Sequence, residues 1–446
     1  MDFLKYIAIP QSLEHFLLLR VFLNIVLALS LPYLGIVTGT MILSLYYDRR
    51  GRVKGDALAS RFANDLIQTF VPGKSYLAYL AVLPVLSVAF LFAQMFQNTP
   101  AMTVSLATWA FIFLLIAAVF IYLYRYTTHL QTVFLSQEEA GKTMQEFSAS
   151  NESTRRKAGK WGLFMLFIAW FFLAAGLTLA ADPKAWNTTV TIFPMLLSGG
   201  AWIRLVFFLL YGLAITASAV PVYFLVWKVR AMGVDAEYHG FIVRQSERIA
   251  FPALLIMPII VILTILSLPD VALRGSSMLL AGLSIVLMLA AGQFFYTMDR
   301  EKNYSYAIGA FLAMIVVGIA MGTSDQIAIG SASRNHAAVL AVLYEKDAEE
   351  FKAKMGVAGV ALTGQEIYDA KCSACHQFDQ VKVGPAYREV LPKYQDAKQK
   401  LVAFILNPTK IDPRYPPMPA QGLKPAEADS IATFLLKKYA PAPAGS

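Results

Sequence analysis

Eight long apolar stretches in the first part of the chain constrain its fold more than any other feature of the sequence. A helix of roughly 20 apolar residues crosses the hydrocarbon core of a bilayer, which is about 30 Å thick. The stretches lie near residues 21–46, 76–95, 102–124, 161–181, 203–227, 249–268, 277–297 and 304–323. We therefore predict an all-α fold that begins with a polytopic bundle of about eight transmembrane helices.

Composition supports this class. The 446 residues are 57% hydrophobic and 15% charged, whereas soluble domains average roughly 45–50% and about 25%. A net charge of +9 would be compatible with nucleic-acid binding in a soluble protein, but the basic residues cluster in links beside the apolar stretches. We expect the lipid bilayer, and no nucleic acid, as a partner.

The charge of the links predicts the orientation of the chain. Basic residues follow the first, third, fifth and seventh stretches, and the first of these links carries Arg49, Arg50, Arg52, Lys54 and Arg61. The links on the other side hold little beyond Lys184 and Arg274. Cytoplasmic links are the ones rich in Lys and Arg. We therefore expect a multi-pass protein of the bacterial inner membrane, with both termini on the periplasmic side.

The two cysteines of the chain, Cys372 and Cys375, lie in the stretch KCSACHQF. A structural zinc site typically has four ligands, and the sequence holds no second cysteine pair. A thioredoxin-like dithiol belongs to a βαβ context, which the flanking sequence does not offer. The Cys-x-x-Cys-His pattern instead indicates covalent attachment of one haem c, with His376 next to the second cysteine as an iron ligand. This haem is attached outside the cytoplasm, in agreement with the predicted orientation.

The sequence after this motif has a specific order of features. KVGPAYREV is followed by the helical pattern QDAKQKLVAFILNP, and then by YPPMPAQGLKPAEADSIATFLLKKY, a methionine loop that leads into an amphipathic helix. Residues 363–446 thus resemble the small all-α mono-haem class I cytochromes c. The resemblance implies that His376 and Met418 are the axial ligands of the iron. It also implies that the carbonyl of Pro385 accepts the ring N–H of this histidine. The side chains expected to pack around the haem are Tyr368, Tyr387, Phe404, Ile431 and Phe434.

These patterns divide the chain into three segments. Residues 1–323 form the transmembrane domain, 324–362 an extracytoplasmic stalk and 363–446 the cytochrome c domain. Within the stalk, the periodicity from Asn335 to Met355 predicts an amphipathic helix with Asn335 as its N-cap.

Histidines are scarce in the predicted membrane domain. His129 and His239 fall in or beside cytoplasmic links, while His15 and His336 lie near the outer surface, which weighs against two stacked bis-histidine haems. The first helix, with its exported N-terminus and early histidine, resembles that of subunit I of cytochrome bd quinol oxidases. That resemblance implies His15 as a ligand of haem b. His336 lies outside the resemblance and is a candidate to pair with His15 if both lie at the outer surface. A second intramembrane histidine and an acidic quinol-binding loop of that family are not found, and an interfacial, hydrogen-bonding histidine is the alternative.

Polar residues inside apolar spans often mark function. Arg20 and Arg204 lie near the outer ends of their spans, where each is a candidate for binding a quinone headgroup or haem propionates. The alternative is that they extend to the lipid surface.

The sequence predicts a membrane-bound c-type cytochrome that carries electrons between a membrane quinol or redox complex and periplasmic carriers, in a respiratory or photosynthetic chain. One alternative is a haem-containing catalytic subunit of a bd-like quinol or cytochrome oxidase or reductase, and another is a structural anchor subunit of a respiratory complex. The expected partners are periplasmic redox proteins and the quinone pool or other respiratory subunits. Lysines expected to steer acidic partners are Lys382, Lys393, Lys398, Lys400 and Lys424.

Overall fold

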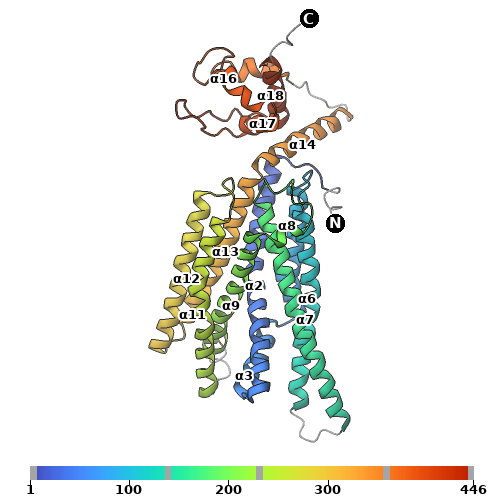
Figure 1. Ribbon diagram of the computed structural model, residues 1–446, viewed down its shortest axis with the longest axis vertical. Coiled ribbons are helices and arrows are strands. Elements are labelled where there is room, and N and C mark those ends of the chain that lie inside the picture. The colour runs from blue at the N-terminus through green and yellow to red at the C-terminus, as the bar shows by residue number, and fades with distance from the viewer. Residues whose placement is uncertain (1–7, 136–141, 228–234, 355–361, 440–446) are drawn as a thin grey trace. The chain divides into compact units, whose positions relative to one another are not determined.

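The computed structural model describes residues 8–135, 142–227, 235–354 and 362–439, and these residues contain helices and no β-strand (Figure 1). The chain separates into two compact units. Residues 1–4, 20–93 and 98–332 form what we call the bundle unit, and residues 5–19, 94–97 and 333–446 form the C-terminal unit. The all-α fold predicted from the sequence is confirmed.

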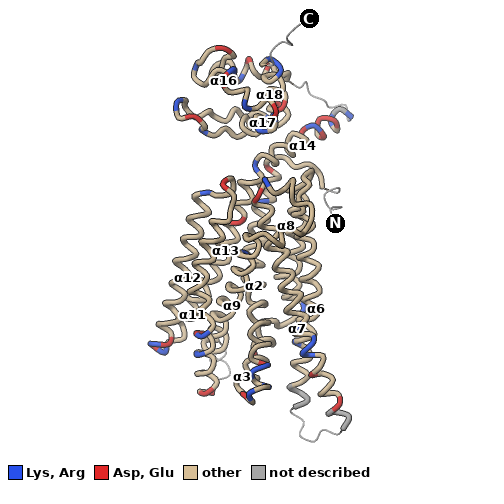
Figure 2. The backbone as a smooth tube through the Cα atoms, in the orientation of Figure 1, with Lys and Arg blue, Asp and Glu red and all other residues tan. Residues whose placement is uncertain are grey.

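The described residues include eight helices that are long and apolar enough to cross a membrane. The eight stretches are α2 (Leu13–Lys54), Lys74–Met95 (α4, Lys74–Leu77; η1, Ala78–Val82; α5, Leu83–Met95), α6 (Thr103–Leu135), α7 (Lys142–Ala180), Gly199–Trp227 (α9, Gly199–Pro221; η2, Val222–Trp227), α11 (Ala236–Leu266), α12 (Gly275–Glu301) and α13 (Tyr306–Ala332). Each predicted stretch falls on one of them. In the bundle unit, the middle of these helices carries few charged residues, and Lys and Arg gather toward helix ends (Figure 2).

Two shorter helices of the bundle unit were not predicted. One is α3 (Ala57–Phe70), which lies in the basic link after the first span, and the other is α8 (Phe193–Leu196). The side chain of Asp56 caps α3 by accepting a hydrogen bond from the backbone N–H of Ala59 at 3.0 Å, as expected of an N-cap aspartate. The buried side of α3 includes Phe62 and Leu66.

Small residues allow α2 and α9 to cross closely in the core of the bundle. A Cβ added to Gly39 would overlap the carbonyl of Gly212, so only glycine fits this crossing. Beside it, Thr216 of α9 donates its hydroxyl hydrogen to the carbonyl of Ile36 at 3.1 Å. In the apolar segment that could cross a membrane, 72% is buried inside the protein for Gly199–Trp227 (α9 and η2), but 28% for α12. The α9 helix is therefore central in the bundle unit and α12 is peripheral.

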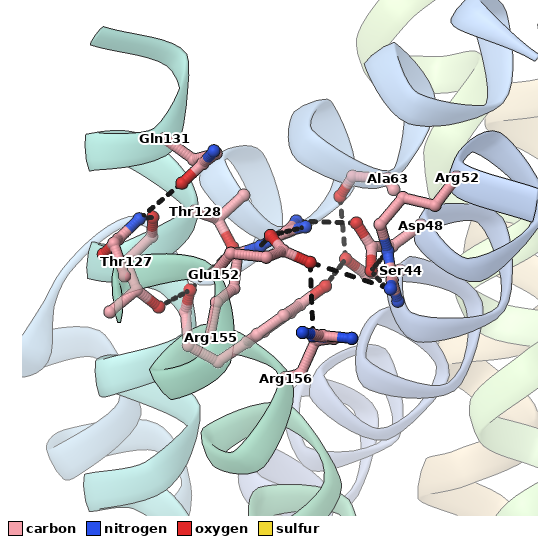
Figure 3. A network of polar contacts seen from close by, with 12 residues as sticks. Ser44, Asp48, Arg52, Ala63, Thr127, Thr128, Gln131, Glu152, Arg155 and Arg156 are labelled. Atoms are coloured by element: carbon pink, nitrogen blue, oxygen red, sulfur yellow. Dashed lines mark hydrogen bonds and ion pairs between the residues drawn. The ribbon is translucent and has the colours of Figure 1, made fainter. Parts of the chain in front are cut away.

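A charged network joins α2 and α7 near the basic link (Figure 3). The guanidinium of Arg155 donates to Asp48 at 2.6 Å and to Glu152 at 2.5 Å, and Arg52 donates to Asp48 at 3.0 Å. Asp48 and Arg155 are buried, with 7% and 8% of their surfaces exposed. Arg155 therefore holds two helices together, in addition to contributing to the charge bias of the loops.

A second buried ion pair joins α9 to α13. Arg204, 3% exposed, pairs with Asp325, 8% exposed. We had placed the end of the eighth span at residue 323, but α13 continues to Ala332. Asp325 was missed for this reason, because it lies just beyond the last apolar window.

Seven elements follow the bundle in sequence among the described residues of the C-terminal unit. They are α14 (Arg334–Lys354), α15 (Gly364–Ile367), the π-turn η3 (Tyr368–Cys372), α16 (Tyr387–Val390), the 3₁₀ turn η4 (Leu391–Tyr394), α17 (Lys398–Leu406) and α18 (Pro425–Tyr439). The predicted stalk helix is α14, but it begins at Arg334, so Asn335 lies in its first turn and is not its cap. Residues 355–361, near the end of the predicted stalk, lie outside the described residues.

We expect loss of the buried carboxylate in Asp325→Asn to destabilise the bundle by about 3–5 kcal/mol, because Arg204 then keeps an unpaired charge in apolar surroundings. Thermal unfolding of the detergent-solubilised protein measures this. The matched control is Asp299→Asn, since Asp299 forms an exposed ion pair with Lys302. The double variant Arg204→Leu/Asp325→Leu should recover much of the loss, and equal unfolding temperatures for the two asparagine variants would refute this role.

Candidate haem-binding site

The cysteine motif lies at the end of a short, strongly capped helix. Thr363 and Glu366 form a capping box, in which the backbone N–H of Thr363 donates to the Glu366 carboxylate at 2.7 Å. These hydrogen bonds hold the pKa of Glu366 below its usual value. The helix then widens into the π-turn η3, a form often found at functional sites, which ends at Cys372. The N–H of His376 donates to the carbonyl of Cys372 at 2.9 Å, so both residues belong to one helical turn.

The ring of His376 is held in one orientation. Its Nδ1 lies 3.1 Å from the carbonyl oxygen of Pro385, and because a carbonyl only accepts, Nδ1 must carry the donated proton. Nε2 is then left with its lone pair free for a metal. A Cβ added to Gly384 would overlap the imidazole, so a glycine is required beside the ring. Tyr387 stacks on it, with the ring centroids 5.1 Å apart and the planes 19° apart.

The segment that carries Pro385 is tied back to the motif by backbone hydrogen bonds. Gly384 N–H donates to the carbonyl of Cys375 at 3.0 Å, and Tyr387 N–H donates to that of Gln377 at 2.9 Å. The fold of this loop therefore sets the position of the Pro385 carbonyl.

A cavity of about 290 Å³ opens beside the motif. Its wall brings together all five residues that the sequence assigned to haem c, namely Cys372, Cys375, His376, Pro385 and Met418. Met418 comes from the loop between α17 and α18. Apolar side chains form much of the remaining wall, and they include Leu391, Leu401, Phe404, Ile405, Ile431 and Leu435.

The five packing residues predicted from the sequence divide into two groups. Tyr387, Phe404 and Ile431 line the cavity as expected. Tyr368 and Phe434 instead pack against each other, with ring centroids 5.8 Å apart, on the apolar core behind the wall. These two residues thus support the wall and are not part of it.

Burial and charge shape the chemistry of the cavity. Cys372 is 8% exposed, and burial raises the pKa of its thiol and that of the Tyr387 hydroxyl. At the wall, hydrogen bonds from Arg414 lower the pKa of Asp412 to about 2. Cationic side chains also line the cavity, and the sequence did not assign Lys371, Lys410 and Arg414 to the site. Their signals were the position of Lys371 next to the cysteine motif and the two basic residues, Lys410 and Arg414, that precede Met418.

These features fit a covalently bound haem. Two sulfurs lie on the wall for thioether links, an imidazole has its Nε2 available, a thioether sulfur lies on the same wall, and the surroundings are apolar. Such a site defines the class of haem-binding electron-transfer domains.

Comparison with known proteins agrees with this class. Residues 361–438 match the cytochrome c family. Cytochrome c-551 of Pseudomonas denitrificans is 38% identical over 79 residues, which are 17% of this chain and 95% of that protein. Cytochrome c-552 of Hydrogenobacter thermophilus is 35% identical over 88 residues, 19% of this chain and 90% of that protein. Through its C-terminal domain, the chain belongs to the cytochrome c family, which indicates electron transfer and a haem c cofactor.

The four residues predicted as a site in the membrane domain fall into different units. His15 and His336 belong to the C-terminal unit, and Arg20 and Arg204 to the bundle unit. His15 is exposed and packs edge-on against Tyr344 of α14, with the ring centroids 5.7 Å apart. The roles of His15 and His336 at a haem b remain predictions.

The lysines expected to steer acidic partners also differ in their surroundings. Lys398 forms an ion pair with Asp429 at 2.9 Å, so its charge is already compensated. Lys393 lines the cavity instead.

We expect His336 to make stability depend on pH. Burial lowers its pKa from 6.5 to about 4. As the pH falls below 6.5, the unfolded chain takes up a proton that the folded chain refuses until about pH 4. The free energy of unfolding is therefore highest above pH 6.5, and it falls by about 2–3 kcal/mol as the pH drops from 6.5 to about 4. Unfolding temperatures from circular dichroism across the interval should fall less for His336→Gln than for the unaltered protein, and parallel curves would contradict the assignment.

Proposed function

We propose that this protein is a membrane-bound cytochrome c that carries single electrons between a donor in the membrane and redox proteins in the periplasm. The observation that carries the proposal is that the described residues combine eight membrane-length helices with a cavity lined by Cys372, Cys375, His376 and Met418. The apolar helices fit an anchor in the bilayer, and the C-terminal unit fits a water-exposed electron carrier.

Each residue of the site has a defined role in this proposal. The sulfurs of Cys372 and Cys375 would hold the porphyrin, and His376 Nε2 and Met418 Sδ would bind the iron. The Pro385 carbonyl keeps the proton on Nδ1 and raises the basicity of the ligating nitrogen. When bound, the haem supplies one-electron oxidation and reduction. With an imidazole and a thioether both binding the iron, the group would carry electrons and would not bind a substrate.

Cationic residues in the wall complement the carboxylates that a haem carries. Lys393 and Lys410 line the cavity, as does the Arg414–Asp412 ion pair. Arg414 is already bonded to Asp412, so the lysines of the wall, which also include Lys371, are the better candidates for neutralising the haem propionates.

The proposed location is the bacterial inner membrane, with the C-terminal unit in the periplasm. The charge bias of the links supports this orientation. It also matches the compartment in which c-type haem is attached.

The proposed donor is a quinol or another redox complex of the membrane, and the two arginines of the bundle unit differ in their suitability to contact it. Arg204 is neutralised by Asp325. Arg20 lies against Gly330, and the described residues show no carboxylate paired with it. The Nε atoms of both arginines lack hydrogen-bond partners there, so the ion pair is what separates them. Arg20 is therefore the better candidate for contact with a polar headgroup.

We expect Arg20→Ala to slow reduction of the haem by a quinol analogue. The control is Arg388→Ala, which changes an exposed arginine.

Replacing the proposed sulfur ligand should change the reduction potential. We expect Met418→His to lower the potential by on the order of 0.2 V, within the roughly 0.8 V range that axial ligands span, because methionine favours the reduced iron. A redox titration of the purified protein measures this shift. Met321→Leu is the control, because Met321 is a buried methionine of the bundle unit. Equal potentials for Met418→His and the control would refute the ligand assignment.

The number and type of haems test the function as a whole. One covalent haem per chain, visible as peroxidase activity on a denaturing gel and lost in Cys372→Ala/Cys375→Ala, is expected from an electron carrier. A pyridine haemochrome spectrum with an additional extractable haem would instead favour the bd-like catalytic alternative. Absence of covalent haem would refute the proposal.

A further inference from the structure

The helix before the cytochrome c domain is part of the domain's core. α14 lies outside residues 361–438, which match the cytochrome c family. Nevertheless it packs against α17 and α18, and Val342 of α14 belongs to the same buried cluster as Cys372 and Tyr387. Because this segment shares the core beside the haem motif, it is more than a tether.

Polar contacts fix α14 on this surface. Lys346 of α14 and Lys398 of α17 both pair with Asp429 of α18, at 3.8 and 2.9 Å. At its N-terminal end, Arg334 donates a hydrogen bond to the carbonyl of Asn407 at 2.5 Å. Asn407 is the C-cap of α17. A cationic donor is favourable there, because the last carbonyls of a helix lack intrahelical partners and carry partial negative charge.

Asn407 is also the first residue of the methionine loop, which we define as residues 407–424 between α17 and α18. This loop contains no helix or strand, and its other hydrogen bonds include local ones, such as those of Arg414 and Tyr415 to Asp412. Within this loop, the first residue that lines the cavity is Thr409, two positions after Asn407, and Met418 lines it further along. The contact from Arg334 therefore holds the loop at the point where it leaves α17.

We infer that Arg334 is a positioning residue for the methionine ligand, and that α14 is a brace built into this cytochrome domain. The inference rests on the proposed ligation by Met418. Segments with few contacts open locally at low free-energy cost, and opening of this loop would withdraw the sulfur from the iron. The hydrogen bond from Arg334 raises the cost of that opening.

The experiment uses the full-length protein in detergent and the sulfur-to-iron charge-transfer absorption of the ferric haem. This band reports methionine ligation directly. As the pH is raised, the band disappears when another ligand replaces the sulfur. We expect Arg334→Ala to increase the equilibrium constant for sulfur loss about tenfold, the size of one charge-assisted hydrogen bond, and to move the midpoint of the transition to lower pH by about one unit. Arg334→Lys, which keeps a cationic donor, should restore most of this stability.

The matched control is Arg388→Ala, which removes an exposed arginine of the same domain that pairs with Asp379. A transition in Arg334→Ala that coincides with those of this control and the unaltered protein would overturn the inference. It would also be overturned if Arg334→Ala lowered the unfolding temperature but lost the band only on unfolding. If the unaltered protein lacked the band altogether, the proposed Met418 ligation itself would fail, and that result is distinguishable from the others.

Discussion

The hydrogen bond between His376 and the Pro385 carbonyl is the interaction on which the haem site depends. An imidazole that could rotate or change tautomer would present either nitrogen to the cavity, whereas this bond leaves one nitrogen available. It exists because Gly384 leaves space for the ring and because the loop is tied back to Cys375. The apolar wall, the sulfur pair and the methionine loop are arranged around a ring that is already fixed.

The bundle unit is stabilised by a different combination of forces. Within a bilayer, burial of apolar surface gives little preference for one helix arrangement over another, so close packing and polar contacts acquire more weight. The glycine crossing of α2 and α9, the Asp48–Arg155 network and the Arg204–Asp325 pair supply such contacts. A haem domain that resembles small soluble proteins is thus joined to a bundle whose specificity depends on a few buried polar residues.

Much of this architecture could be predicted from the sequence, because apolar length and the Cys-x-x-Cys-His spacing are local signals. The positions of His376, Pro385 and Met418 on one cavity followed from the order of motifs in residues 363–446. What the sequence could not show is pairing between distant segments. Asp325 lay outside an apolar window and Arg334 outside a recognised family, and each acquires its role only from a partner more than one helix away. His15 was interpreted through its place in one helix, whereas its ring contact comes from α14.

The Arg204–Asp325 pair also has a consequence for how the protein is made. Chains are synthesised from the N-terminus, so α9 is made before α13, and Arg204 has no counterion until Asp325 has been made. Asp325 lies on the last membrane-length helix, and its arrival completes the charge balance of the bundle core. The cysteine motif follows α13 in the chain. Synthesis therefore completes α13, and with it both members of the ion pair, before the cysteine motif is made.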